Sequence, residues 1–176
     1  MGKHAEHTKK LIEDTLIDLM NDKNLEKIKV TDITSKLDLH RSTFYEYFAD
    51  IYEVVDEIEK EYLKVIKDVV EKYSDDFIKC MRSLAIFVKS NRDTFNVLLN
   101  KMNFHFNDAL FLTAQKIYLN IFLKTEDEQE KKRVLYNSYF VISGSIGILS
   151  FWILRNCDIS IDEFTSIMGN YLKKRY

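Results

Sequence analysis

The chain has 176 residues, enough for one domain or two small ones, and its 46% hydrophobic and 31% charged residues are typical of a globular protein. It has no proline and only four glycines, which argues against sandwiches, barrels and glycine-rich phosphate loops. The formal net charge of −2 lacks the basic excess typical of many nucleic-acid-binding or membrane-surface proteins. We therefore expect a mostly helical chain with short polar connections.

Apolar residues recur at helical spacing along nearly the whole chain. The N-terminal part predicts three short helices, over residues 6–21, 31–37 and 41–48. The rest predicts longer helices over residues 52–73, 76–89, 94–100, 104–124 and 131–155, and a last one that begins at Asp158 or Ser160 and ends near Tyr176. This division predicts a small head, residues 1–51, and a larger body, residues 52–176.

The segment from Val134 to Leu154 runs 21 residues without a charge, about the length that crosses a bilayer. It contains several serines and has charged flanks, and a helix that is apolar all round is also typical of a buried central helix. We favour the buried helix over a membrane span. From its polar N-terminus we expect no signal peptide, and the two isolated cysteines predict reduced thiols in a cytoplasmic protein.

Residues 30–48 carry the strongest functional signal. Ile33 and Leu37 share one helical face, and Phe44 and Phe48 repeat on the next helix, across a three-residue turn. This layout is that of a helix-turn-helix, whose second helix presents its N-terminal residues, here Arg41, Ser42 and Thr43, to bases and phosphates. By geometry alone, a plain helical hairpin with an exposed polar tip is an equal alternative.

The run Thr43-Phe44-Tyr45-x-Tyr47-Phe48, preceded by Val30-x-Asp32-Ile33, resembles the DNA-binding domain of TetR/AcrR-type transcriptional regulators. The resemblance covers roughly residues 8–55 and implies an all-α homodimer of about nine helices, with a DNA-binding head and a ligand-sensing body. It implies that Thr43, Tyr45 and Tyr47 contact phosphates, that Arg41 and Ser42 approach bases, and that Thr31 touches backbone or base.

Four residues depart from the family pattern. Asp38 stands where a turn glycine is usual, and it tolerates the left-handed conformation at modest cost. His40 replaces a capping serine, Tyr47 a histidine, and Ile51 a lysine that would contact phosphate.

The charge of the head argues for caution about affinity. Residues 1–55 hold eight Lys or Arg against eleven Asp or Glu, whereas binding to phosphates needs local cations. The cations that could form one positive face are Lys9, Lys10, Lys27, Lys29, Lys36 and Arg41. We expect modest affinity with strong salt dependence.

One face of the long apolar helix predicted over residues 131–155 has small residues at its centre. Small residues there would let another helix approach closely. This face and a matching face on the last helix predict a four-helix dimer interface with Tyr136, Phe140, Ser143, Gly147, Ser150, Phe164, Met168 and Tyr171. Packing within one chain is the alternative. The segment from Tyr139 to Trp152 resembles the C-terminal domain of the dihydroxyacetone kinase operon activator branch, with Gly144, Gly147 and Trp152 as recurring positions, and this favours the dimer.

Aromatic residues crowd the middle of the chain, where they form either ordinary core or a cavity for a small apolar effector. The residues assigned to that pocket are Phe87, Phe95, Met102, Phe111, Tyr118 and Phe122. No catalytic motif, metal-ligand set or cofactor motif emerges. The sequence thus predicts a non-enzymatic regulator that binds palindromic operator DNA as a homodimer. The alternative is a co-activator whose body docks a partner protein.

Overall fold

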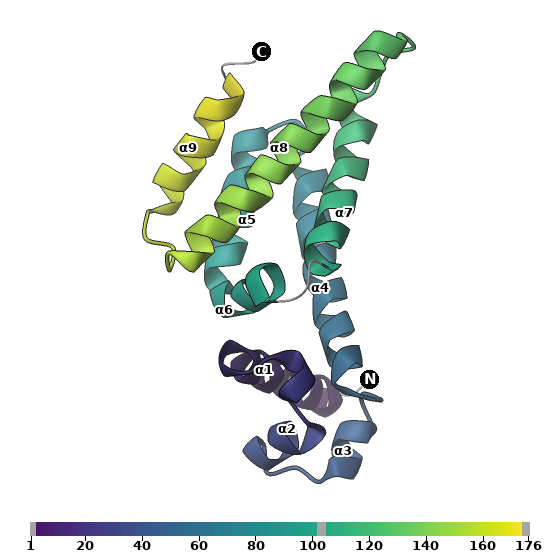
Figure 1. Ribbon diagram of the computed structural model, residues 1–176, viewed down its shortest axis with the longest axis vertical. Coiled ribbons are helices and arrows are strands. Elements are labelled where there is room, and N and C mark those ends of the chain that lie inside the picture. Colours follow the sequence, from purple (N-terminus) through teal and green to yellow (C-terminus); the bar gives the residue numbers. More distant parts are fainter. Residues whose placement is uncertain (1–2, 102–104, 174–176) are drawn as a thin grey trace. The chain divides into compact units, whose positions relative to one another are not determined.

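The computed structural model describes residues 3–101 and 105–173, and within these ranges every regular element is helical (Figure 1). The all-α prediction is confirmed. Contacts divide the chain into two compact units, Met1–Tyr62 and Leu63–Tyr176, here called the head and the body. The boundary falls inside one helix, α4 (Ile51–Lys72), whereas the sequence predicted a division after residue 51, near the start of that helix.

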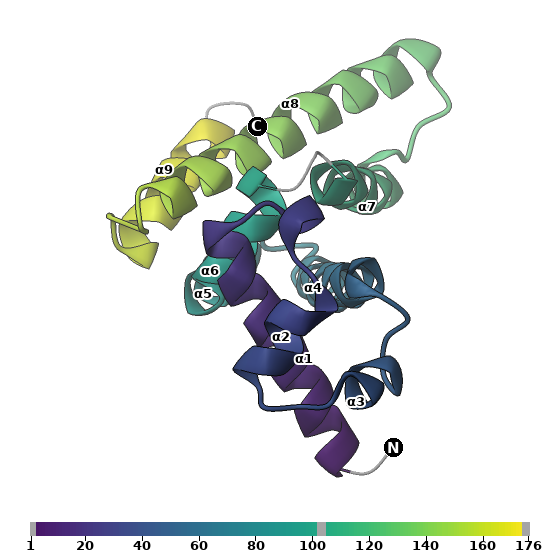
Figure 2. The ribbon, with the colours of Figure 1, turned by 60° about the horizontal axis from the view of Figure 1, so that its bottom comes forward.

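The head comprises α1 (Lys3–Asp22), the 3₁₀ turn η1 (Leu25–Lys27), α2 (Val30–Lys36), α3 (Arg41–Tyr45) and the first part of α4. Helix α2 packs on both α1 and α3 (Figure 2). The apolar faces of these helices form the core of the head. Its buried residues include Ile12, Leu16, Ile33, Phe44, Phe48, Val54 and Ile58. Helix α3 is shorter than predicted, because residues 46–47 form a turn after it.

The body holds α5 (Phe77–Ser90), α6 (Arg92–Asn96), the π-helix η2 (Val97–Lys101), α7 (His105–Phe122), α8 (Glu128–Leu154) and α9 (Ile161–Lys173). Helix α9 packs along α5, and α7 packs along α8 (Figure 1). One buried cluster joins Ala85, Trp152, Cys157, Phe164 and Met168, in which the Trp152 and Phe164 rings stack with centroids 4.4 Å apart. This cluster ties α9 to the end of α8.

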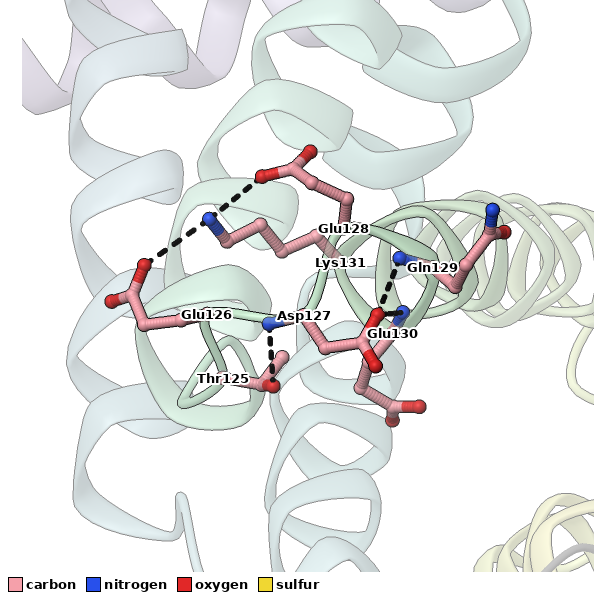
Figure 3. Close-up of polar contacts among 7 residues, drawn as sticks. All are labelled: Thr125, Glu126, Asp127, Glu128, Gln129, Glu130 and Lys131. Carbon is pink, nitrogen blue, oxygen red and sulfur yellow. Dashed lines mark hydrogen bonds and ion pairs between the residues drawn. The ribbon is translucent and has the colours of Figure 1, made fainter.

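The acidic run before α8 forms the first turn of the helix (Figure 3). Asp127 is the N-cap, and its carboxylate accepts hydrogen bonds from the amides of Gln129, at 2.7 Å, and Glu130, at 3.3 Å. Lys131 forms ion pairs with Glu126, at 3.4 Å, and Glu128, at 3.0 Å. Carboxylates here satisfy amides that have no partner within the helix and interact well with its dipole.

The reversal between α8 and α9 uses two residues with positive φ, Asn156 at 60° and Cys157 at 52°. The amide of Cys157 donates to the carbonyl of Trp152 at 2.8 Å, which closes the end of α8. Asp is a common turn residue, but Asp158 does not adopt a positive φ here. Its Oδ2 instead forms an ion pair with Nε of Arg155 at 2.5 Å. The close approach between helices occurs at Gly169, where a Cβ would lie 2.6 Å from Cδ1 of Ile78.

Helix α8 is not buried all round, and in this respect the expectation of a central buried helix is wrong. Its described side chains are buried at Val134, Ser138, Ile142, Trp152 and Ile153, while most of one face remains exposed. By length and composition α8 could cross a membrane, but a single such helix is weak evidence, because core helices of soluble proteins pass the same test.

Candidate nucleic-acid interface and body cavity

The turn between α2 and α3 is closed by a residue other than glycine. Asp38 has a φ of 52°, and the amide of Leu39 donates to the carbonyl of Thr34 at 2.9 Å. This bond, with a left-handed residue just before its donor, is the main feature of a Schellman C-cap. The prediction that Asp38 takes the place of the turn glycine is confirmed.

Side chains cap both helices of this motif. The Asp32 carboxylate accepts a hydrogen bond from the amide of Lys29 at 3.0 Å, at the start of α2. At the start of α3, Nδ1 of His40 accepts one from the amide of Ser42 at 3.3 Å, and it lies 2.8 Å from the Ser42 hydroxyl oxygen. His40 therefore serves as an N-cap, with a longer bond than Asp32 makes.

The apolar residues of the motif hold α3 against the rest of the head. Phe44 is fully buried and Phe48 nearly so, with ring centroids 5.9 Å apart. From α1, the Lys9 ammonium lies 5.3 Å from the centroid of the Phe48 ring, a distance suited to a cation–π contact. These contacts fix which side of α3 faces outward.

The residues predicted to contact DNA have accessible side chains. Lys29, Arg41, Ser42 and Tyr45 are exposed, whereas Thr31, Thr43 and Tyr47 are half-buried. Six of the seven lie within or beside α2 and α3, and Tyr47 is in the turn after α3.

The cations of the head differ in their partners. Lys10 forms ion pairs with Glu13, at 3.4 Å, and Asp14, at 3.5 Å, and burial raises the pKa of Glu13 against the opposing effect of Lys10. Among the described residues, Lys29, Lys36 and Arg41 have no ion-pair partner, and all three are exposed. These cations lie in or beside α2 and α3, where the exposed carboxylates of Asp38 and Glu46 also have no ion-pair partner among the described residues, so this part of the head carries unpaired charges of both signs.

The body contains a cavity of about 400 Å³. Helices α4, α5, α7, α8 and α9 contribute to its wall, which is almost wholly apolar. Tyr118 and Phe122, two of the residues assigned to a pocket, line it. Phe95 is instead fully buried between Phe87 and Phe106, and Phe111 packs on Tyr139 with ring centroids 4.7 Å apart. Phe87, Phe95 and Phe111 are absent from the wall, and Met102 lies outside the described residues.

The exposed face of α8 carries the residues assigned to a dimer interface. Tyr136 is 76% exposed and Phe140 61%, and Ser143, Gly144 and Gly147 continue this face, with Ser150 half-buried at its edge. A Cβ built on Gly144 or Gly147 would meet nothing within 4 Å. Within its own chain, therefore, neither glycine is required by close packing.

The α9 residues assigned to the same interface lie elsewhere. Phe164 and Met168 are buried in the body's own core, where α9 packs along α5, and both reach the cavity wall. The side chain of Tyr171 lies outside the described residues. Helical spacing predicted an apolar face on α9 but not which surface it would meet.

Two thiols are also buried in the body. Cys80 lies in the cavity wall and Cys157 in the core cluster, and both are free. Burial raises the pKa of Cys80 to about 11 and also raises that of Cys157. A raised pKa leaves little reactive thiolate at neutral pH, so these residues have the character of structural cysteines. Among the described residues no cluster of three or more potential metal ligands occurs.

Comparisons with known proteins agree with this architecture. Residues 75–174, more than half of the chain, match a TetR-type family described as "Transcriptional regulator C-terminal region". No curated protein matches the chain. A solved structure of the dihydroxyacetone kinase operon activator DhaS is 19% identical, with a TM-score of 0.62, over 96% of this chain and 95% of that one.

Two further solved structures share the fold. A TetR transcriptional regulator from Streptococcus agalactiae 2603V is 16% identical, with a TM-score of 0.68, over 97% of this chain and 96% of that one. The fatty acid degradation regulator FadR from Bacillus halodurans is 10% identical, with a TM-score of 0.69, over 97% and 94%. At these identities the likeness extends to the fold and not to the ligand of any one protein.

Proposed function

The chain belongs to the TetR family of transcriptional regulators, and from this membership we propose that it binds operator DNA of two-fold symmetry as a homodimer in the cytoplasm. One observation carries the proposal. The motif formed by α2, the Asp38 turn and α3 rests on buried Phe44 and Phe48 and leaves Arg41 exposed at the start of α3. An α-helix held in this way can enter the major groove.

The contacts divide by chemistry. Arg41, with its planar fork of donors, reads a guanine, and Ser42 lies beside it at the N-terminal end of α3. Thr43, Tyr45 and Tyr47 donate hydroxyl hydrogen bonds to phosphates. Lys29 and Thr31, at the start of α2, contact the DNA backbone. The phosphate contacts place the head on the duplex, and Arg41 supplies sequence preference.

The dimer forms through the exposed face of α8. We assign Tyr136, Phe140, Ser143, Gly147 and Ser150 to it, with the small residues where two α8 helices cross. A glycine inside a helix costs about 1 kcal/mol relative to alanine, and nothing in the chain itself approaches Gly147. Close approach by a second copy gives this glycine a structural role. A two-fold axis at α8 pairs the two heads with two half-sites.

An effector in the body cavity regulates DNA binding by favouring one of two states of the dimer, competent or incompetent for the operator. The exposed apolar face of α8 also favours a second function, in which the body docks a partner protein and the chain acts as a co-activator.

Selection of bound duplexes from a random pool tests the proposal. We expect enrichment of an inverted repeat whose half-sites lie about one helical turn apart, because a two-fold dimer imposes this spacing. A pool without enrichment, with protein shown to be folded, would reject operator binding. Enrichment of single half-sites would retain DNA binding and reject the dimeric mode.

A further inference from the structure

The wall of the body cavity is unusual in lacking charge. Its described residues include no Lys, Arg, His, Asp or Glu. Its polar groups are the hydroxyls of Tyr73, Ser74, Tyr118 and Ser145 and the thiol of Cys80. None of these side chains carries a carboxyl, amine, guanidinium or imidazole group that could pair with a charged ligand. A ligand here meets a surface that is almost wholly apolar, open to solvent on one side near Ser74 and Phe122, and it finds no ion-pair partner in the wall.

This wall discriminates against charged ligands for a physical reason. A carboxylate or ammonium loses its hydration on entry, and without an opposite charge the protein does not compensate that loss. Cys80 reports the same environment, since burial raises the pKa of its thiol to about 11. Surroundings that disfavour a thiolate also disfavour the carboxylate of a bound fatty acid.

The size of the cavity limits the ligand as well. Its volume of about 400 Å³ corresponds to roughly 13 water-sized groups, at about 30 Å³ each. A medium-length alkyl chain with one small head group fits this space. A neutral head such as an alcohol enters this apolar space without burying an unpaired charge.

We propose that the body cavity selects an uncharged, predominantly apolar molecule of medium chain length, and excludes the acid and amine of the same chain. This inference rests on the proposed function only for its regulatory meaning, namely that such a molecule is the effector. Binding itself is a property of the body and is measured without DNA.

Three probes with the same alkyl chain and different head groups test the selectivity: decan-1-ol, decanoate and decylammonium, each titrated calorimetrically into the full chain at neutral pH. We expect decan-1-ol to bind at a ratio of one per chain. We expect each charged probe to bind at least about tenfold more weakly, since about 1.4 kcal/mol of uncompensated charge burial gives one decade. Decanoate or decylammonium binding as tightly as decan-1-ol would overturn the proposal, and so would the absence of decan-1-ol binding by folded protein.

A matched pair of variants on α7 tests the location. Ala114 lines the cavity, whereas Leu112 on the same helix is 63% exposed. Ala114→Phe should abolish decan-1-ol binding by filling the space, and Leu112→Phe should leave it unchanged. Ser145→Phe, from α8, fills the same cavity from another wall and serves if Ala114→Phe does not fold. Retained decan-1-ol binding in a folded cavity-filled variant would place the ligand elsewhere, for example on the exposed face of α8, and would reject this site.

The outcome is distinguishable from failure of the proposed function. Duplex selection uses protein without ligand, so an enriched operator together with no decan-1-ol binding rejects the effector class alone. Decan-1-ol binding together with no enriched duplex keeps the cavity assignment and rejects its regulatory meaning.

Discussion

Arg41 is the first residue of α3, and it is exposed beside Ser42, whose hydroxyl lies 2.8 Å from Nδ1 of His40. The cap orients the start of the helix, and Phe44 anchors its inner side. Arg41 thus projects from a short element held at both its start and its inner face. Such restraint matters for base readout, because a bidentate contact tolerates little error in position.

We expect Arg41→Ala to weaken binding to the selected operator by about 1–3 kcal/mol for each half-site and to relax preference at one base pair per half-site. Arg41→Lys is the matched control, because it keeps the charge and loses the planar fork. It should retain more affinity than Arg41→Ala while losing the same base preference. Fluorescence anisotropy on the operator and on single-base variants measures both effects. Equal affinity of wild type and Arg41→Ala would remove Arg41 from base reading.

Cys80 predicts a pH dependence of the free energy of unfolding. Its pKa is raised from 9.0 to about 11 in the folded chain, so the unfolded chain releases the thiol proton first. The stabilisation is fully present below pH 9.0, is lost as the pH rises, and levels off above about 11. Urea denaturation across this range should show a steeper loss for wild type than for Cys80→Ala. Parallel profiles would contradict burial of this thiol in a water-poor wall.

At the scale of elements, two opposite faces of α8 border different surroundings: one lines the cavity and the other is exposed to solvent. Val141, Ser145 and Leu149 line the cavity, and Phe140, Gly147 and Leu154 lie on the exposed face, roughly opposite. One helix therefore borders both the proposed effector and the proposed partner copy. In the proposed assembly, a ligand that shifts α8 would change the dimer interface without any further connecting element.

Gly147 tests the exposed face. Because nothing lies within 4 Å of the point that a Cβ would occupy there, Gly147→Leu should leave the single chain folded, and the higher helix propensity of leucine should favour α8. In the dimer the added side chain separates the crossing helices. Light scattering should therefore report monomer or aggregate for Gly147→Leu. Asn120→Leu, which adds the same side chain to an exposed position of α7, should remain a dimer. An intact Gly147→Leu dimer would reject the proposed interface.

The sequence predicted which segments are helical far better than what covers them. Period-three and period-four spacing placed α1, α4, α5 and α8 to within a few residues, because one face of each is apolar. The same spacing could not tell whether Phe164 faces a partner or its own chain, since both surfaces select large apolar residues. Phe95 and Phe111 were assigned to a pocket on composition, and only three-dimensional packing distinguishes a pocket wall from filled core.

The same difference holds between the two candidate sites. The turn of the helix-turn-helix motif was predicted from local residues, whereas the cavity in the body was not. The Asp38 turn follows from neighbouring residues alone, and its left-handed conformation was predictable. The cavity is different, because Ile66 of α4, Ala114 of α7 and Ser145 of α8 meet there from distant parts of the sequence. No periodic pattern reveals such a meeting.

For the whole molecule, the net charge of −2 is compatible with DNA binding only if cations gather on one surface. Lys27, Lys29 and Lys36 are exposed around α2, whereas Lys10 is neutralised by Glu13 and Asp14. A dimer offers two copies of this set. Attraction to DNA then depends on few charges, within a chain whose acidic residues oppose approach.

Operator affinity should therefore fall steeply with salt. With about six lysine–phosphate contacts per dimer, we expect a loss of roughly a thousandfold between about 50 and 200 mM salt. Lys36→Ala should lower the slope of log affinity against log salt by about two, one for each copy. Lys10→Ala, with its charge already paired, should change the slope little. Anisotropy titrations over this range provide the measurement, and an operator affinity independent of salt would contradict the phosphate contacts.

The exposed face of α8 also bears on the life of a newly made chain. In the proposed dimer, the exposed side chains of Tyr136, Phe140, Phe151 and Leu154 would stay in water until a second copy arrives, and the rate of that encounter would rise with the square of the chain concentration. At low copy number, single chains persist longer and are bound by chaperones or degraded by proteases that recognise exposed apolar segments. The surface that we assign to pairing would thereby set a threshold of synthesis below which the regulator does not accumulate.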